Sequence, residues 1–249
     1  MIPLATETQV AIAAVLEELR ATWPALPPLE NFNQSDGAFS FRVASMDVVG
    51  SHMPAPIPWG DLEDPCRASW IGKDAEPILR LHKSHLVLVV REEGQPLECA
   101  RLLTQVTASV FPACEEALGV LWVPARLLVP PSVFRDFAVN MLERPLYIWI
   151  DFRAGKRSDG LTEGFTTGME ALGHMEFETR TAPDTPGELR ERFFTLANYV
   201  LDHGPVIKDG DTIGEDSAAQ IRATRVHSAF GRNSDVLRLD WQSKSQKKQ

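Results

Sequence analysis

Hydrophobic residues recur with two different spacings along this chain. Spacings of three and four residues predict helices over residues 6–22, 96–111 and 132–142. Apolar runs and period-two alternation predict strands over residues 39–49, 85–90, 117–123, 146–152, 206–213, 223–230 and 236–241. Helices and strands alternate at first, and strands dominate the end. This order predicts an α+β protein with mixed or antiparallel sheets and packed helices.

The segment at residues 162–180 combines both kinds of signal. Three glycines divide it, and the six residues from Gly168 to Gly173 suit one helical turn closed by glycine. Beyond that turn, one set of alternate residues is Met175, Phe177 and Thr179, and the other is Glu176, Glu178 and Arg180. Such alternation predicts a strand with one buried and one exposed face.

A further helix begins with a specific local signal. Thr185-Pro-Gly-Glu188 is a capping box with proline at the first helical position. The expected buried face of this helix consists of Leu189, Phe193, Leu196, Ala197 and Val200. Gly204 is the expected end of the helix.

Pro130-Pro131 is the best candidate for a boundary between two subdomains. We therefore expect an N-terminal α+β half over residues 1–130 and a C-terminal α+β half over residues 131–243, which carries the glycine motifs. Residues 244–249 contain three lysines and no acid, and we expect a flexible basic tail there.

Charge and cysteine content narrow the possible functions. The 249 residues carry a formal net charge of −9, and without the basic end the body is more acidic still. General nucleic-acid binding needs a basic face, so the balance argues against it. No apolar run reaches the roughly 20 residues of a membrane span, and no secretory signal is visible at the start. Three scattered cysteines fit a reduced, cytoplasmic protein.

Patterns for metal, cofactor and nucleophile sites are incomplete, so we expect no metal, no cofactor and no catalytic residue. His82 and His85 are three apart, but no acid or cysteine stands at a matching offset. The turn around Asp209 and Asp211 lacks the oxygen ligands of a calcium loop, and it fits a tight Asp-Gly turn better. The glycines at 164, 168 and 173 do not form a phosphate loop.

An alternative enzymatic reading uses Glu176, Glu178 and His174. Both glutamates point to one side of the predicted strand, and paired carboxylates can act as general acid and base. An exposed alternating face produces the same pattern, and strand periodicity favours that explanation. A hydrolase or other small-molecule enzyme is thus the alternative, and not the preferred reading.

Two glycine motifs carry a resemblance to a known family. They are Thr167-Gly-Met-Glu-Ala-Leu-Gly173, followed by Glu176 and Glu178, and Asp209-Gly-Asp-Thr-Ile-Gly214. Together with the segment at residues 75–90, they resemble a bacterial family of unknown-function domains over about residues 40–240. Some members lie beside toxins of interbacterial secretion systems, and the similarity extends to an immunity protein of a type VI secretion nuclease effector. The family has no agreed catalytic residues.

The resemblance implies a protein that binds and neutralises a cognate effector toxin by forming a stoichiometric complex. An acidic protein suits a nuclease, whose substrate-binding surface must be basic. The partner expected is therefore a secreted protein toxin, with no nucleic acid and no membrane. The densest acidic cluster is the candidate contact surface, and it comprises Asp209, Asp211, Glu215 and Asp216. A scaffold protein unrelated to toxins is the third possibility.

Overall fold

The computed structural model describes residues 1–68, 75–141, 143–214 and 220–242. The chain divides into two compact units, Met1–Trp149 and Ile150–Gln249. The boundary expected at Pro130-Pro131 falls inside unit 1, because these prolines only connect a strand to the helix that follows it. The expected basic tail at residues 244–249 lies outside the described residues.

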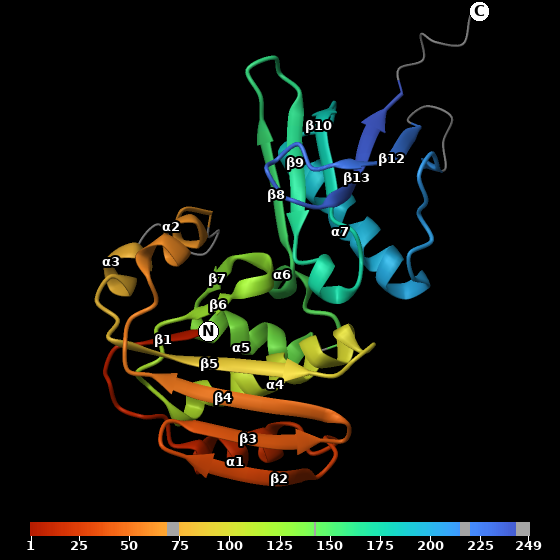
Figure 1. The fold of residues 1–249 in the computed structure, drawn as a ribbon. Coiled ribbons are helices and arrows are strands. Elements are labelled where there is room, and N and C mark those ends of the chain that lie inside the picture. Colours follow the sequence, from red (N-terminus) through yellow and green to blue (C-terminus); the bar gives the residue numbers. More distant parts are fainter. Residues whose placement is uncertain (69–74, 142, 215–219, 243–249) are drawn as a thin grey trace, which may run out of the picture. The chain divides into compact units, whose positions relative to one another are not determined.

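Unit 1 contains a five-stranded sheet in which every neighbouring pair is antiparallel (Figure 1). In spatial order the strands are β1 (Ile2–Leu4), β5 (Ser84–Arg91), β4 (Met46–Met53), β3 (Ala38–Val43) and β2 (Leu29–Ser35). The single strand predicted over residues 39–49 is two strands, which reverse direction at Ala44, a residue with a positive φ of 52°. The turn-rich residues 31–37 belong largely to edge strand β2, a strand that the sequence did not predict.

Helices cover one face of this sheet, where Phe39, Phe41 and Val43 are buried as their alternation indicates. Helix α4 (Pro96–Ala113) contacts β5 and packs against α1 (Ile12–Thr22). The opposite face is exposed at the cross-strand pair Val49 and Val89, whose exposures are 42% and 46%. The continuous apolar run of β5 therefore does not mark a strand covered on both faces, as such runs often do.

The remaining described elements of unit 1 lie outside this sheet. They are α2 (Trp59–Ala68), α3 (Ala75–Leu79), β6 (Val120–Trp122), the 3-10 turn η1 (Val123–Ala125), β7 (Leu127–Val129), α5 (Pro131–Asn140) and α6 (Leu146–Trp149). A small apolar cluster joins α2 and α3 to the β6–β7 hairpin through Leu62, Leu79, Leu121 and Leu128.

The strand predicted over residues 146–152 is wrong for its first half. Residues 146–149 form α6, and the strand starts later, at Asp151. The N–H of Ile148 bonds to the carbonyl of Pro145, which closes a helical turn. Trp149 is fully buried and its indole Nε1 donates to Thr104 Oγ1 at 2.7 Å. Tertiary burial thus outweighs the high strand propensity of this run.

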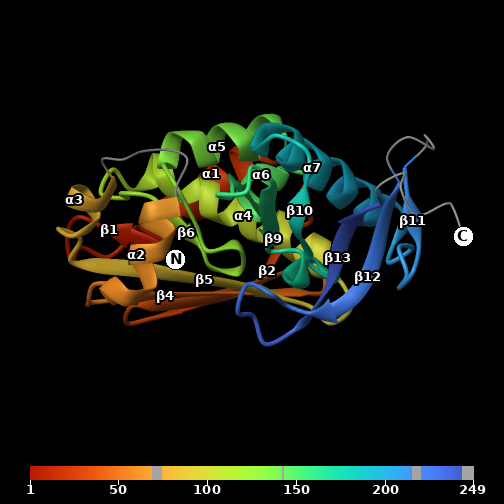
Figure 2. The same cartoon turned by 90° about the horizontal axis from the view of Figure 1, so that it is seen from above.

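Unit 2 is a six-stranded mixed sheet with one helix along it (Figures 1 and 2). Its strands, in spatial order, are β11 (Thr212–Ile213), β12 (Ile221–His227), β13 (Asp235–Trp241), β10 (Phe177–Ala182), β9 (Thr162–Thr167) and β8 (Asp151–Lys156). Only the β10–β13 pairing is parallel. The two sheets with their packed helices make the protein α+β, as the sequence predicts.

Helix α7 (Pro186–His203) begins and ends as predicted. Thr185 and Glu188 form the reciprocal capping box, and Gly204 follows the last helical residue with φ 79°. The five residues predicted for its inner face are all buried. Close packing of α7 against β9 requires glycine at position 164, because a Cβ there would lie 2.4 Å from the carbonyl oxygen of Arg153 and 3.0 Å from Leu189.

Candidate functional site

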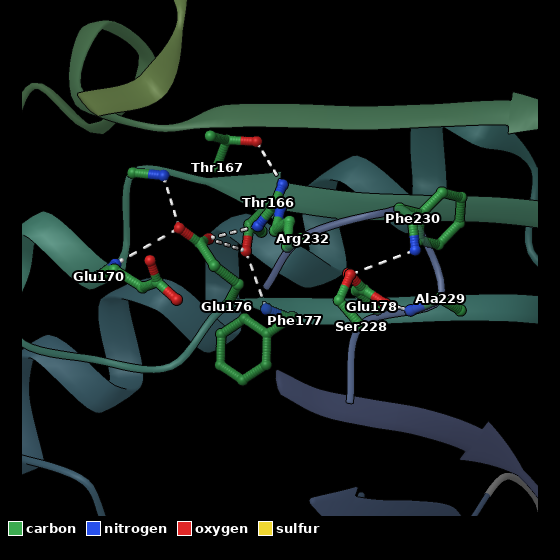
Figure 3. Close-up of polar contacts among 11 residues, drawn as sticks. Thr166, Thr167, Glu170, Glu176, Phe177, Glu178, Ser228, Ala229, Phe230 and Arg232 are labelled. Carbon is green, nitrogen blue, oxygen red and sulfur yellow. Dashed lines mark hydrogen bonds and ion pairs between the residues drawn. The ribbon is translucent and has the colours of Figure 1, made fainter. Parts of the chain in front are cut away.

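Glu176 lies immediately before β10 and is only 2% exposed. Its Oε1 accepts the N–H of Gly168 at 2.7 Å and that of Glu170 at 3.4 Å, while its Oε2 accepts the hydroxyl of Thr166 at 2.6 Å (Figure 3). The two N–H donors belong to the turn that links β9 to the 3-10 turn η2 (Glu170–Leu172). The carboxylate therefore fixes the shape of the glycine-containing turn.

Glu178 lies two residues further along and is 1% exposed. It accepts the hydroxyl of Ser228 and, at 2.9 Å, the N–H of Ala229. Both donors come from residues 228–234, which connect β12 to β13 and which we call the strap. Glu178 thus anchors the strap to β10, although Ser228 lies 50 positions further along the chain.

The strap lies over the face of the sheet opposite α7. Phe177 stacks with Phe193 of α7, so the neighbouring side chains Glu176 and Glu178 point to the other face. On that face the ring of Phe230 in the strap packs against Phe165 of β9, with centroids 4.8 Å apart. The exposed polar face predicted for β10 is therefore wrong at its two glutamates, because the strap covers them.

Arg232 of the strap completes the cluster. Its Nη2 donates to Thr167 Oγ1, and its guanidinium lies 5.0 Å from the centre of the Phe165 ring. Its Nη1 is buried, lies 3.8 Å from Glu176 Oε2 and has no hydrogen-bond partner. This ion pair is too long for a hydrogen bond, so it contributes attraction without directional bonding.

Burial shifts the pKa of three side chains in unit 2. Desolvation raises the pKa of Glu176, against the hydrogen bond from Thr166 and the positive charge of Arg232. Desolvation also raises the pKa of Asp151, although Arg153 donates to it at 2.6 Å and opposes the shift. For His174, burial lowers the pKa.

The three residues of the enzymatic alternative do not form one constellation. His174 lines a small pocket of about 50 Å³ with apolar neighbours that include Phe177 and Val200, on the α7 side of the sheet. In the described part of the chain, no hydrogen bond or ion pair joins it to either glutamate. Both glutamates already bind protein donors, and so they are not poised to transfer a proton to a substrate.

The comparisons with known proteins identify this region. A DUF4261 domain, a domain of unknown function, is found at residues 165–240. No curated protein and no solved structure matches the chain. The match confirms the resemblance to a family of unknown-function domains for these residues, and the segment at residues 75–90 lies outside it.

The bounds of the DUF4261 domain enclose Glu176, Glu178 and the whole strap. They leave out β8, which pairs with β9 and forms the edge of the same sheet. Unit 2 thus contains the DUF4261 domain together with β8, the β8–β9 connection and the first residues of β9. In sequence the glutamates stood out, but their partners in the strap did not, because no local spacing links positions 178 and 228.

The acidic candidate surface is also part of the DUF4261 domain. Asp209 and Asp211 are exposed, yet Asp209 accepts the N–H of Arg225 and Asp211 accepts that of Lys208, each at 2.8 Å. Gly210 between them has φ 88°, as expected for an Asp-Gly turn. Glu215 and Asp216 lie outside the described residues.

The guanidinium of Arg222 reduces the negative charge of this turn. A Cβ on Gly210 would lie 3.8 Å from a guanidinium nitrogen of Arg222, whereas the side chain of Arg225 pairs with Asp235. The turn is therefore less acidic than its sequence alone indicates. Within the described ranges, no group of three or more His, Cys, Asp or Glu side chains is placed to hold a metal ion. No helix described for this chain is long and apolar enough to cross a membrane.

Proposed function

We propose that this protein is an immunity protein, which binds a cognate type VI secretion effector in the cytoplasm and neutralises it by forming a stoichiometric complex. The effector is a nuclease in this proposal, which takes the chain to be a relative of the immunity protein TsiT. Neutralisation by binding requires a stable body and a complementary surface, and it requires no active site.

One observation favours a binding protein over an enzyme. The most conspicuous polar residues of the DUF4261 domain, Glu176 and Glu178, are buried and accept five hydrogen bonds from protein donors. Catalytic acids and bases instead need access to the substrate and a free proton position. The motif thus supports a role in holding the domain together.

The distribution of charge supports a basic partner. Unit 1 carries 18 acidic and 11 basic side chains, whereas unit 2 carries 16 and 14. Most of the negative charge of the protein thus belongs to unit 1, with a smaller part in the unit that holds the acidic turn. Negative charge would accelerate the capture of a nuclease through its basic substrate-binding face.

The decisive experiment titrates the nuclease activity of an effector with this protein. The effector to use is the product of a toxin gene immediately upstream. The proposal expects activity to fall linearly and to vanish at a molar ratio of 1:1. Neutralisation at far lower ratios would indicate enzymatic turnover, and absence of any complex would favour a scaffold; either result contradicts the proposal.

A further inference from the structure

Two buried histidines of unit 1 hold the proline-rich loop at residues 54–58. His82 Nε2 accepts the N–H of Ile57 at 2.6 Å, and His85 Nδ1 lies 2.7 Å from the carbonyl oxygen of Ala55. His82 follows α3, and His85 lies in β5. Only 7% of His82 and 8% of His85 is exposed.

The partners of His82 determine its protonation state. Its Nδ1 is bonded to the carbonyl oxygen of Leu79, which can only accept, so Nδ1 carries the proton. Ile57 N–H can only donate, so Nε2 must present its lone pair. The ring is therefore neutral, and a second proton on Nε2 would face the amide proton of Ile57 directly.

The loop at residues 54–58 has few other backbone groups that can donate a hydrogen bond. Pro54, Pro56 and Pro58 have no N–H, so Ala55 and Ile57 provide the only backbone donors between positions 54 and 58. The side chain of Ile57 is 3% exposed and belongs to the apolar cluster with Leu62, Leu79, Leu121 and Leu128. Release of the Ile57 N–H would thus loosen both the loop and this part of the core.

The charged surroundings do not favour a histidine cation. Burial is the main cause that lowers the pKa of His85, with His82, the Met1 amine and His52 acting in the same direction and the bond to Ala55 opposing them. Burial also lowers the pKa of the Met1 amine, to about 5. On β4, His52 Nε2 lies 3.1 Å from Ser84 Oγ, which donates to the carbonyl of Thr6.

Neighbouring elements add no carboxylate that binds either ring. On α3, Glu76 and Arg80 pair with each other at 2.8 Å, and Arg80 also lies over the ring of Trp59. Lys83 is exposed, and burial raises the pKa of the Cys66 thiol on α2. Among the described residues, no hydrogen bond or ion pair connects a carboxylate to His82 or His85.

We propose that His82 is a proton-operated clamp: protonation of Nε2 expels the Ile57 N–H from its hydrogen bond and releases the loop at residues 54–58 from the core of unit 1. The device is independent of the proposed binding of a toxin. Because a solvated imidazole binds a proton more readily as the pH falls, opening of the loop should be favoured about tenfold at pH 5.5 relative to pH 7.5.

Amide exchange of the full-length protein measures this opening. The protection factor of the Ile57 amide, corrected for the intrinsic dependence of exchange on pH, should fall about tenfold between pH 7.5 and 5.5. His82→Gln offers a carbonyl acceptor that does not titrate, so its protection factor should be nearly constant. His227→Gln, at an exposed histidine of β12, should keep the wild-type response. A constant factor in the wild type, or an equal fall in His82→Gln, would overturn the proposal.

The ring itself provides a second test, which needs no variant. The ¹⁵N shifts of the His82 ring at pH 7.5 should show a protonated Nδ1 and an unprotonated Nε2. A protonated Nε2 at that pH would contradict the clamp even if His82→Gln failed to fold.

Discussion

The two units bury different kinds of polar group. Unit 1 carries most of the negative charge, but the part of it that the structure describes buries no carboxylate, and its buried titratable side chains there are His82, His85 and Cys66. Unit 2 is nearer to neutral, yet it buries Asp151, Glu176 and Glu178. Charge at a surface and charge in an interior thus serve different purposes: the first attracts partners, and the second fixes turns by accepting hydrogen bonds.

The largest expected effect comes from removing the best-bonded carboxylate. Glu176→Ala leaves two backbone N–H groups and the Thr166 hydroxyl without their acceptor, and it leaves Arg232 without the nearby negative charge. We expect a loss of about 3 kcal/mol in the free energy of unfolding of unit 2. Urea denaturation measures it, and Glu170→Ala is the matched control, because Glu170 is exposed in the same turn and contributes only its N–H. Equal midpoints for the two variants would contradict the anchoring role.

Packing of α7 on β9 provides the next test. Gly164→Ala places a methyl group against the Arg153 carbonyl and the side chains of Leu189 and Phe193. The backbone must shift, and we expect a loss of about 2 kcal/mol. Gly155→Ala in the same hairpin meets nothing within 4 Å and should change stability little. Thermal unfolding of both variants separates the two outcomes; a stable Gly164→Ala protein would refute this close packing.

Release of the strap should be a smaller effect. Glu178→Ala removes the acceptor of Ser228 and Ala229, but Ala229 is exposed and water can replace the lost bond. We expect a loss of about 1.5 kcal/mol and faster tryptic cleavage after Arg232. Ser228→Ala removes one of the two bonds and should show an intermediate rate. If cleavage is as slow in Glu178→Ala as in the wild type, Glu178 does not hold the strap.

The buried groups also predict opposite pH trends of up to about 1 kcal/mol in the two units. The folded pKa of His85 is lowered, so its contribution to unit 1 is complete above about pH 6.5 and declines as the pH falls below it. The folded pKa values of Glu176 and Asp151 are raised, so their contribution to unit 2 is complete below about pH 4 and declines as the pH rises. Asp151→Asn should remove part of the trend in unit 2, as followed by urea unfolding from pH 4 to 7. If the free energy of unfolding changes with pH equally in Asp151→Asn and the wild type, Asp151 does not contribute to the pH dependence of unit 2.

Local signals in the sequence predicted local structure well. The capping box at Thr185 and Glu188 and the buried face of α7 depend on residues within a few turns of each other, and both are confirmed. The strand expected at Leu146 fails because burial of Trp149 against Thr104 is a tertiary effect. The exposure expected for Glu178 fails for the same reason, since its cover comes from Ser228. Periodicity shows which residues share a face, but not what covers that face.

The most direct test of the account concerns the amides that donate to the two glutamates. In the proposed function, these carboxylates hold the DUF4261 domain together and take no part in a reaction. In the double variant Glu176→Ala/Glu178→Ala, the amides of Gly168, Glu170 and Ala229 lose their acceptors and should exchange with solvent at least about tenfold faster than in the wild type, while the Ile57 amide of unit 1 stays unchanged. Removal of catalytic groups commonly leaves stability unchanged or raises it. Unchanged or slower exchange at these three amides in the folded double variant would contradict the claim.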